Sequence, residues 1–176
     1  MPNREELALK SFVAVDFETA NRSPLSACQI ALVRFENSKP IEDFVSFIKP
    51  PQAYGHFEFT YLHGISEPDV AQAPTWLDLA DKLTSLIGDC PVYAHNASFD
   101  SRVWAAVDKY YFKNSLPRRF YCSCNLARQF LPGLYNYKLP TVLAHCDPSF
   151  NLHHHRADSD AMACGIIVSK IQELNR

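Results

Sequence analysis

The sequence predicts an α/β protein with a mixed β-sheet, and two observations support this fold class. Strand-like segments come first along the chain, and short strands alternating with helices follow them. The 176 residues are 47% hydrophobic and 20% charged, a composition typical of a globular domain. We therefore expect one domain over residues 1–176, large enough to bury a core without metal or disulfide staples.

Three strand-like segments open the chain. Phe12–Glu18 begins with four apolar residues, as expected of a strand buried on both faces. Gln29–Glu36 and Glu42–Ile48 alternate more regularly, and a turn-like Asn37–Pro40 separates them. The three segments predict an antiparallel meander. We expect the Pro- and aromatic-rich stretch Pro50–Pro74 to form a long loop or a short helical turn.

Helical spacing of apolar residues begins at Trp76 and ends at Ile87, where Gly88 closes the helix. A short buried strand, Pro91–Ala94, follows. The remaining expected elements are a helix Phe99–Tyr111, a strand Phe120–Cys122, and helices Asn125–Phe130, Pro140–His145 and Ala157–Leu174.

The net charge of −2 excludes a protein that is basic as a whole. Residues 102–138 nevertheless form a basic segment, which holds a polyanion or is a solvated basic face. Its cations are Arg102, Lys109, Lys113, Arg118, Arg119, Arg128 and Lys138.

No apolar run approaches the ~20 residues that cross a bilayer. The polar N-terminus is expected to run straight into the first strand and has no signal-peptide core. We therefore expect a cytoplasmic protein that binds no membrane, with its six cysteines reduced.

Two acids stand at the end of the first strand. Asp16 and Glu18 are two residues apart, so they point to the same face. Burial and mutual repulsion would push protons onto both, and no Lys or Arg adjoins them. A divalent metal ion explains the pair well, although strands also often end in acidic turns.

Asp100 opens a predicted helix directly after the strand that ends at Ala94. Its helical neighbours Val103, Trp104 and Val107 are apolar, so Asp100 heads a buried face at the carboxyl end of a strand, where α/β sheets place their sites. The alternative is an acid that is merely favoured by the helix dipole in the first turn.

A third acid, Asp160, shares an apolar stripe with Cys164 and Ile167, whereas Asp158 does not. Asp160 is therefore the more inward acid. His155 could reach the same place only from the loop before the helix. The alternative for the histidine triplet is an exposed run that binds metal adventitiously.

Four inward acids and one histidine form a constellation suited to two Mg²⁺ or Mn²⁺ ions that clamp a phosphodiester. Hard cations prefer carboxylate oxygens, which argues against zinc. A histidine with a pKa near neutral can take the proton from the attacking water.

The same three segments resemble the motifs of the DEDDh (DnaQ-like) 3′→5′ exonucleases, exemplified by the proofreading epsilon subunit of bacterial DNA polymerase III. Asp16-Phe-Glu18-Thr resembles D-x-E-T, His95-Asn-x-x-Phe-Asp100 resembles H-N-x-x-F-D, and His155-Arg-Ala-x-x-Asp160 resembles H-x-A-x-x-D. Their order and separation agree over about residues 10–172. The resemblance implies an RNase H-like α/β fold with a central five-stranded mixed β-sheet flanked by α-helices.

The resemblance also implies an exonuclease domain that removes nucleoside monophosphates from single-stranded DNA or RNA 3′ ends, with two Mg²⁺ or Mn²⁺ ions and, in some settings, a DNA polymerase partner. Asp16, Glu18, Asp100 and Asp160 would be metal ligands, and His155 the general base. Thr19, His63, Asn96 and Phe99 would contact the substrate.

The alternatives are a non-catalytic domain that binds nucleic acid or a polymerase, and a metal-dependent phosphatase. One departure from the motifs is Asp158, where the family usually carries Leu; its charge is expected to raise the pKa of His155. His154 could also act in place of His155. The basic segment would hold phosphates, and its aromatic residues, Tyr110, Tyr111, Phe112, Phe120 and Tyr121, would stack bases or join the core.

Overall fold

A computed structural model describes residues 1–175 and contains one five-stranded mixed sheet. The strand order is β3-β2-β1-β4-β5. β1, β2 and β3 pair antiparallel, which confirms the predicted meander, and β4 and β5 run parallel to β1. The strands are β1 (Ser11–Thr19), β2 (Ala27–Glu36), β3 (Lys39–Phe47), β4 (Val92–Ala94) and β5 (Phe120–Cys122).

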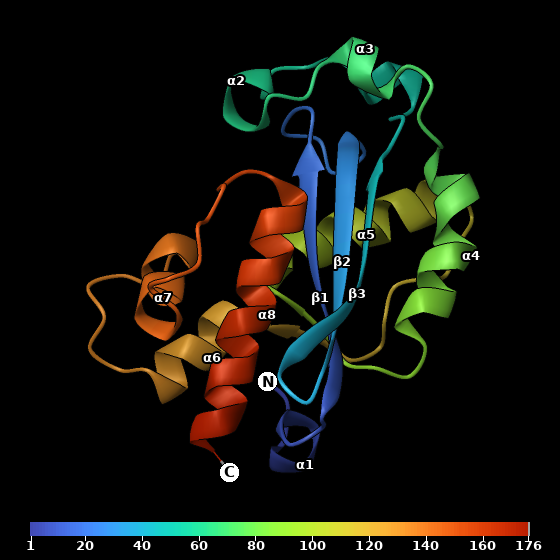
Figure 1. Cartoon of the computed structure of the whole chain (residues 1–176). Helices are drawn as coiled ribbons and strands as arrows, with labels where there is room; N and C mark the ends of the chain where they lie inside the picture. Colours follow the sequence, from blue (N-terminus) through green and yellow to red (C-terminus); the bar gives the residue numbers. More distant parts are fainter. Residues whose placement is uncertain (176) are drawn as a thin grey trace.

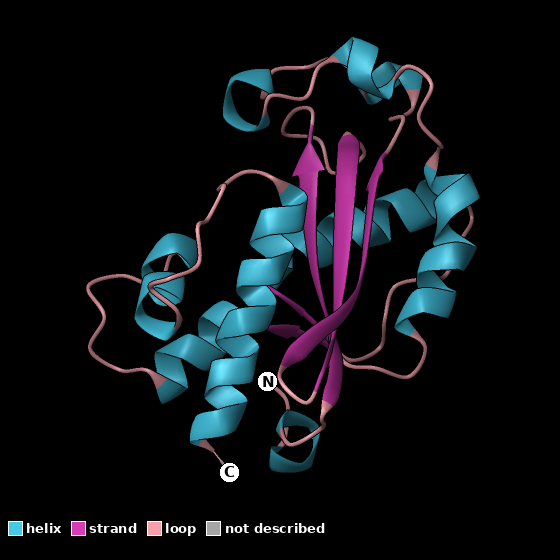
Figure 2. Ribbon diagram, in the orientation of Figure 1, coloured by secondary structure: helices cyan, strands magenta, loops and turns pink. Residues whose placement is uncertain are grey.

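Helices cover both faces of the sheet, so the molecule has three layers (Figures 1 and 2). One face packs against α6 (Ser123–Phe130), α7 (Leu139–Cys146) and α8 (Ala157–Leu174). The other packs against α4 (Trp76–Ile87) and α5 (Ala97–Tyr110). α8 lies against β2 so closely that a Cβ on Gly165 would meet the Phe35 ring at 2.0 Å, which explains a glycine inside this helix.

Two segments differ from the sequence expectations. The N-terminus does not run straight into β1, because Asn3 and Glu6 form a capping box on a one-turn helix, α1 (Arg4–Leu7). The stretch expected as a long loop or a short helical turn contains three short helices, η1 (Gln52–Tyr54), α2 (Thr60–His63) and α3 (Glu67–Val70). They lie over the carboxyl end of β1 and the amino end of β2 (Figure 1).

Alternation along β1 decides where its acids point. Phe12 and Ala14 pack on the α8 side of the sheet, whereas Val13, Val15 and Phe17 pack on the α5 side. Asp16 and Glu18 continue the first set, so both carboxylates point to the side from which α8 approaches. The predicted shared face of the two acids is confirmed.

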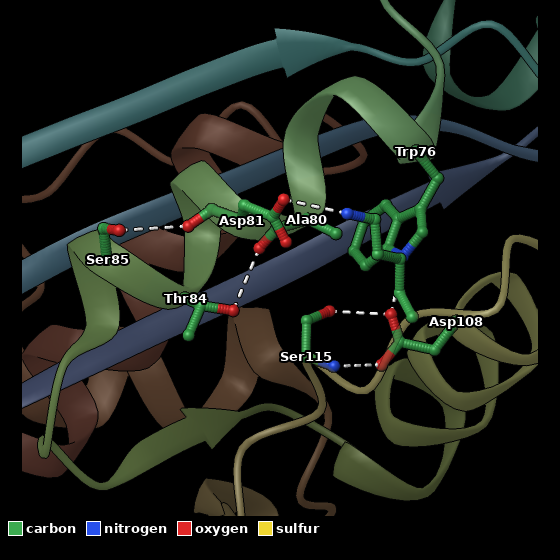
Figure 3. A network of polar contacts seen from close by, with 8 residues as sticks. Trp76, Ala80, Asp81, Thr84, Ser85, Asp108 and Ser115 are labelled. Carbon is green, nitrogen blue, oxygen red and sulfur yellow. Dashed lines mark hydrogen bonds and ion pairs between the residues drawn. The ribbon is translucent and has the colours of Figure 1, made fainter.

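The start of α4 and the turn after α5 are joined by a buried acid, Asp108 (Figure 3). Its carboxylate accepts hydrogen bonds from Trp76 Nε1 at 2.7 Å, Ser115 N at 2.6 Å and Leu116 N at 2.9 Å. Asp108 is 5% exposed. Three donors from two separate segments therefore depend on one side chain.

We expect Asp108→Ala to lower the free energy of unfolding by at least about 3 kcal/mol, because it leaves several buried donors without an acceptor. Chemical denaturation measures this decrease. Asp81→Ala is the control, since Asp81 is exposed and pairs only with Lys113 at the surface. Its effect should stay within about 1 kcal/mol. Equal effects of the two substitutions would contradict this role for Asp108.

Candidate active site

A cavity of about 380 Å³ opens at the carboxyl end of β1. Its walls come from β1, the segment around α2, the start of α5, the start of α7 and the loop before α8. The lining residues predicted from the sequence are Asp16, Glu18, Thr19, Phe99, His155 and Asp160. Residues from distant parts of the chain therefore meet in one place, as the sequence predicts.

Three of the four predicted acids form a compact oxygen cluster. One carboxylate oxygen from each of Asp16, Glu18 and Asp160 lies within 4.8 Å of the others. Glu18 and Asp160 are 7% and 4% exposed, so the predicted inward orientation of Asp160 is confirmed. Hard carboxylate oxygens held this close fit Mg²⁺ or Mn²⁺ better than a softer metal.

Asp100 approaches the cluster from the other face of the sheet and is 1% exposed. β4 pairs with β1 only at Val13 and Ala14, so the β1 backbone beyond them has no strand partner on that edge. Asp100 takes this place, and its Oδ1 accepts a hydrogen bond from Phe17 N at 3.2 Å. This hydrogen bond fixes the carboxylate beside Asp16.

The acids disfavour one another's ionised form. Burial, followed by repulsion from Asp100, Glu18 and Asp160, raises the pKa of Asp16 well above its ordinary value. Burial, followed by repulsion from Asp160 and Asp100, raises the pKa of Glu18 to about 8. Burial also raises the pKa of Asp100 to about 7 and that of Asp160 above its ordinary value. A bound cation would remove this repulsion.

A pH dependence of stability follows from these shifts. Carboxyl groups with a raised folded pKa stabilise the fold below their unfolded pKa, near 4.5 for Glu18, and that stability is lost as the pH rises through about 8. In EDTA we therefore expect the melting temperature to fall between pH 5 and 8.5. Mg²⁺ should oppose the fall.

Thermal melts with EDTA or Mg²⁺ measure this effect. Glu18→Gln should flatten the pH dependence in EDTA, whereas Glu42→Gln, at an exposed position on β3, should leave it unchanged. A melting temperature in EDTA that rises over this range would contradict the account.

Two adjacent histidines stand beside Asp160, and the structure separates their contacts. His154 Nδ1 lies 2.9 Å from Asp160 Oδ2, whereas His155 reaches the same oxygen through its backbone N at 3.0 Å. The two rings stack with centroids 3.9 Å apart. His155 has a left-handed backbone, with φ of 66°, which turns the chain into α8.

The expectation that Asp158 raises the pKa of His155 is wrong. Asp158 Oδ2 pairs with Arg156 Nη2 at 2.9 Å, which neutralises its charge. The pKa of His155 is lowered instead, chiefly by burial and then by the neighbouring His154, while Asp160 opposes the shift. His155 is therefore favoured as a neutral proton acceptor.

The predicted substrate residues are placed unequally. Thr19 and Phe99 line the cavity. His63 is not among the lining residues; its Nε2 lies 3.1 Å from the Thr19 backbone O, and its Nδ1 accepts from Ile65 N at 3.0 Å. Asn96 is outside the lining; it is exposed and left-handed, with φ of 72°, at the start of α5.

Several lining residues were not predicted as site residues. Phe59 and Leu62 come from the segment around α2, and Lys138 and Leu139 come from the start of α7. His95 also faces the cavity, and its ring nitrogens lie 2.9 Å from Ser123 Oγ and from Tyr137 O. Burial lowers the pKa of His95 to about 4, so it is neutral and structural. The H-N-x-x-F-D motif was the one sequence signal for His95.

The basic segment does not form one surface. Lys138 lines the cavity, and Arg102 and Lys109 are exposed on α5. Arg118 and Arg119 instead border a separate cavity of about 250 Å³ near the amino end of β4, where Arg119 O accepts from Val92 N. The arginines before β5 are therefore at the opposite end of the strands from the acids.

The sheet topology and the acids at the end of its central strand define an RNase H-like domain of the nuclease class. An exonuclease family model (RNase_T) matches residues 13–168. The chain belongs to this exonuclease family and is accordingly an enzyme domain, which confirms the resemblance to the DnaQ-like exonucleases.

Two curated relatives are bacterial proteins much longer than the matched region. DNA polymerase III PolC-type of Oceanobacillus iheyensis is 32% identical over 167 residues, which cover 92% of this chain and 11% of that protein. The 3′-5′ exonuclease DinG of Bacillus subtilis is 33% identical over 170 residues, covering 92% and 18%. The chain thus spans a small part of these relatives.

Solved structures confirm the fold. Exonuclease X in complex with 5′ overhanging duplex DNA has a TM-score of 0.71 and 25% identity, with coverage of 92% of this chain and 91% of that one. A structure of exonuclease I has a TM-score of 0.77 at 18% identity, covering 93% of this chain and 41% of that one. Among residues 1–175, every helix is too short or too polar to pass through a bilayer.

Proposed function

We propose that this chain is a divalent-metal-dependent 3′→5′ exonuclease that releases nucleoside monophosphates from nucleic-acid 3′ ends. The observation that carries the proposal is the cluster of Asp16, Glu18 and Asp160 oxygens within 4.8 Å, with Asp100 beside it. No Lys or Arg in the described chain forms an ion pair with these acids. Similarity to a relative named as a 3′-5′ exonuclease supports the polarity.

The four acids serve as metal ligands in this proposal. Two Mg²⁺ or Mn²⁺ ions, when bound, would activate the attacking water and stabilise the leaving oxygen. An Asp16 oxygen lies in the cluster with Glu18 and Asp160, and Asp100 binds the backbone N of the next residue, Phe17, so Asp16 is suited to contact both ions. Glu18, Asp100 and Asp160 would complete the ligand set.

His155 would accept the proton of the attacking water, because it lines the cavity and its lowered pKa keeps it neutral near pH 7. Thr19 and Phe99 would contact the terminal nucleotide, together with the apolar side chains of Phe59 and Leu62, which also line the cavity. His63 would hold the Thr19 backbone in place. Asn96 would serve the turn into α5.

A 5′-labelled single-stranded oligonucleotide incubated with Mg²⁺ tests the proposal. The expected result is a ladder that shortens from the 3′ end and disappears in EDTA. Loss of the label alone would indicate a phosphatase, and tight binding without products would indicate a non-catalytic domain; either result contradicts the proposal. Parallel DNA and RNA substrates define the preference.

A DNA polymerase is a proposed partner, and similarity to part of a PolC-type polymerase supports it. A polymerase-linked editing role predicts faster removal of a mismatched than of a paired 3′ nucleotide. Equal rates on the two ends would argue for degradation of free strands instead.

A further inference from the structure

The side of α5 that faces away from the sheet is exposed and leads away from the active-site cavity. Arg102, Ala105 and Lys109 are all exposed on it, because residues three and seven positions apart lie along one side of a helix. Phe99 lines the cavity and stands one turn before Arg102. The exposed side of α5 is therefore continuous with the rim of the cavity.

The far end of α5 presents aromatic side chains to solvent. Phe112 is 96% exposed, and Tyr110 is 45% exposed. The Tyr110 ring packs edge-on against Tyr54 of η1 at 6.2 Å and against Tyr111 at 4.9 Å. We call Tyr54, Tyr110, Tyr111 and Phe112 the aromatic cluster.

The surrounding structure holds Phe112 in its exposed position. Phe112 has a φ of 54°, a left-handed conformation that is unfavourable for a bulky residue. The turn is fixed from behind, because Lys113 N donates to Asp108 O at 2.8 Å and Ser115 N donates to the Asp108 carboxylate at 2.6 Å (Figure 3). A large apolar side chain held in solvent on a strained backbone indicates binding rather than core packing.

The charges beside the aromatic cluster point to the kind of ligand. Arg102 and Lys109 form no ion pair within residues 1–175, whereas Lys113 is paired with Asp81 at 2.8 Å. Unpaired cations attract backbone phosphates, and exposed aromatic rings stack on bases. A single strand offers both groups, whereas the bases of a duplex are already stacked.

We propose that the exposed side of α5 and the aromatic cluster bind the part of a single-stranded nucleic acid that lies on the 5′ side of the end being cut. This inference rests on the proposed function of the cavity. The 14 residues of α5 span about 21 Å. A stacked strand rises about 3.4 Å per nucleotide, so about six nucleotides would separate the cavity from the aromatic cluster.

Substrate length provides the test. In Phe112→Ala we expect KM for a 12-nucleotide single strand to rise roughly 5- to 150-fold, as for the removal of one base–aromatic stack. KM for a trinucleotide and kcat for both substrates should stay unchanged, because a trinucleotide cannot reach the aromatic cluster. Phe112→Trp should retain the low KM for the long strand.

The cations are tested by salt. Replacing Arg102 and Lys109 together with Gln should reduce the dependence of log affinity for the 12-mer on log salt by about 0.7 for each phosphate that these cations neutralise. Lys39→Gln and Ile41→Ala are matched controls, since both residues are exposed on β3, the edge strand at the other side of the sheet from β5. Neither substitution should change KM for the 12-mer or the salt dependence of its affinity.

Phe112→Gly distinguishes a loss of binding from a folding defect. Its melting temperature should equal or exceed that of the wild type, because glycine accepts a positive φ. Its KM for the 12-mer should still rise. An unchanged ratio of long- to short-substrate KM in Phe112→Ala and Phe112→Gly would overturn the inference and would indicate a surface that binds a protein instead. Fluorescence anisotropy of a labelled 12-mer in EDTA compares the affinities of the same variants without catalysis. A failure of this binding inference is therefore distinguishable from a failure of the proposed exonuclease activity.

Discussion

Asp16→Asn is expected to lower exonuclease turnover by at least about 1,000-fold, because in our proposal Asp16 is a ligand shared by both ions and its loss removes several kcal/mol of transition-state stabilisation. The same substitution should raise the melting temperature in EDTA. Asp16 is the acid that all three neighbours repel, and its pKa is raised well above its ordinary value. A neutral amide of the same shape removes that repulsion.

Initial rates on a 5′-labelled single strand and thermal melts in EDTA measure the two effects together. Asp89→Asn is a matched control, since Asp89 is exposed after α4 and should change neither quantity. Retained turnover in Asp16→Asn would contradict the metal-ligand assignment. A lower melting temperature in EDTA would contradict the repulsion among the acids.

His155→Ala is expected to lower kcat by roughly 10²- to 10⁴-fold, the usual contribution of a general base. His154→Ala should cost less than about tenfold. The two rings differ in their contacts: His154 Nδ1 lies 2.9 Å from the Asp160 carboxylate, whereas within residues 1–175 the His155 ring makes no hydrogen bond. His155 is therefore the ring that is available to a water in the cavity.

The comparison of these adjacent variants under single-turnover conditions decides the assignment. Both should keep the wild-type melting temperature in Mg²⁺, since both rings lie at the surface of the cavity. Loss of activity in His154→Ala with near-normal activity in His155→Ala would transfer the general base to His154.

The acids could be predicted from the sequence because each stands at a place where local structure fixes its direction. Asp16 and Glu18 inherit their direction from the alternation of β1, and Asp160 inherits its direction from the apolar stripe of α8. The chain order of strands and helices likewise follows from periodicity. The residues of the capping box, Asn3 and Glu6, are also visible in the sequence. The expectation that the N-terminus runs directly into β1 did not take them into account.

The remaining lining residues depend on tertiary contacts. Phe59 and Lys138 reach the cavity from loops whose path no periodicity describes. The basic segment divides because the chain crosses from α5 to β5 and back toward the acids at α7, which places Arg119 at the far end of the strands. The predicted effect of Asp158 on the pKa of His155 had the wrong sign, because Arg156 neutralises the charge of Asp158.

The most direct test is a crystal structure determined with Mn²⁺, whose anomalous signal locates each ion. We predict two ions about 3.5–4 Å apart among the carboxylates of Asp16, Glu18, Asp100 and Asp160, with Asp16 touching both. A structure at saturating Mn²⁺ in which these carboxylates hold no ion would contradict the account.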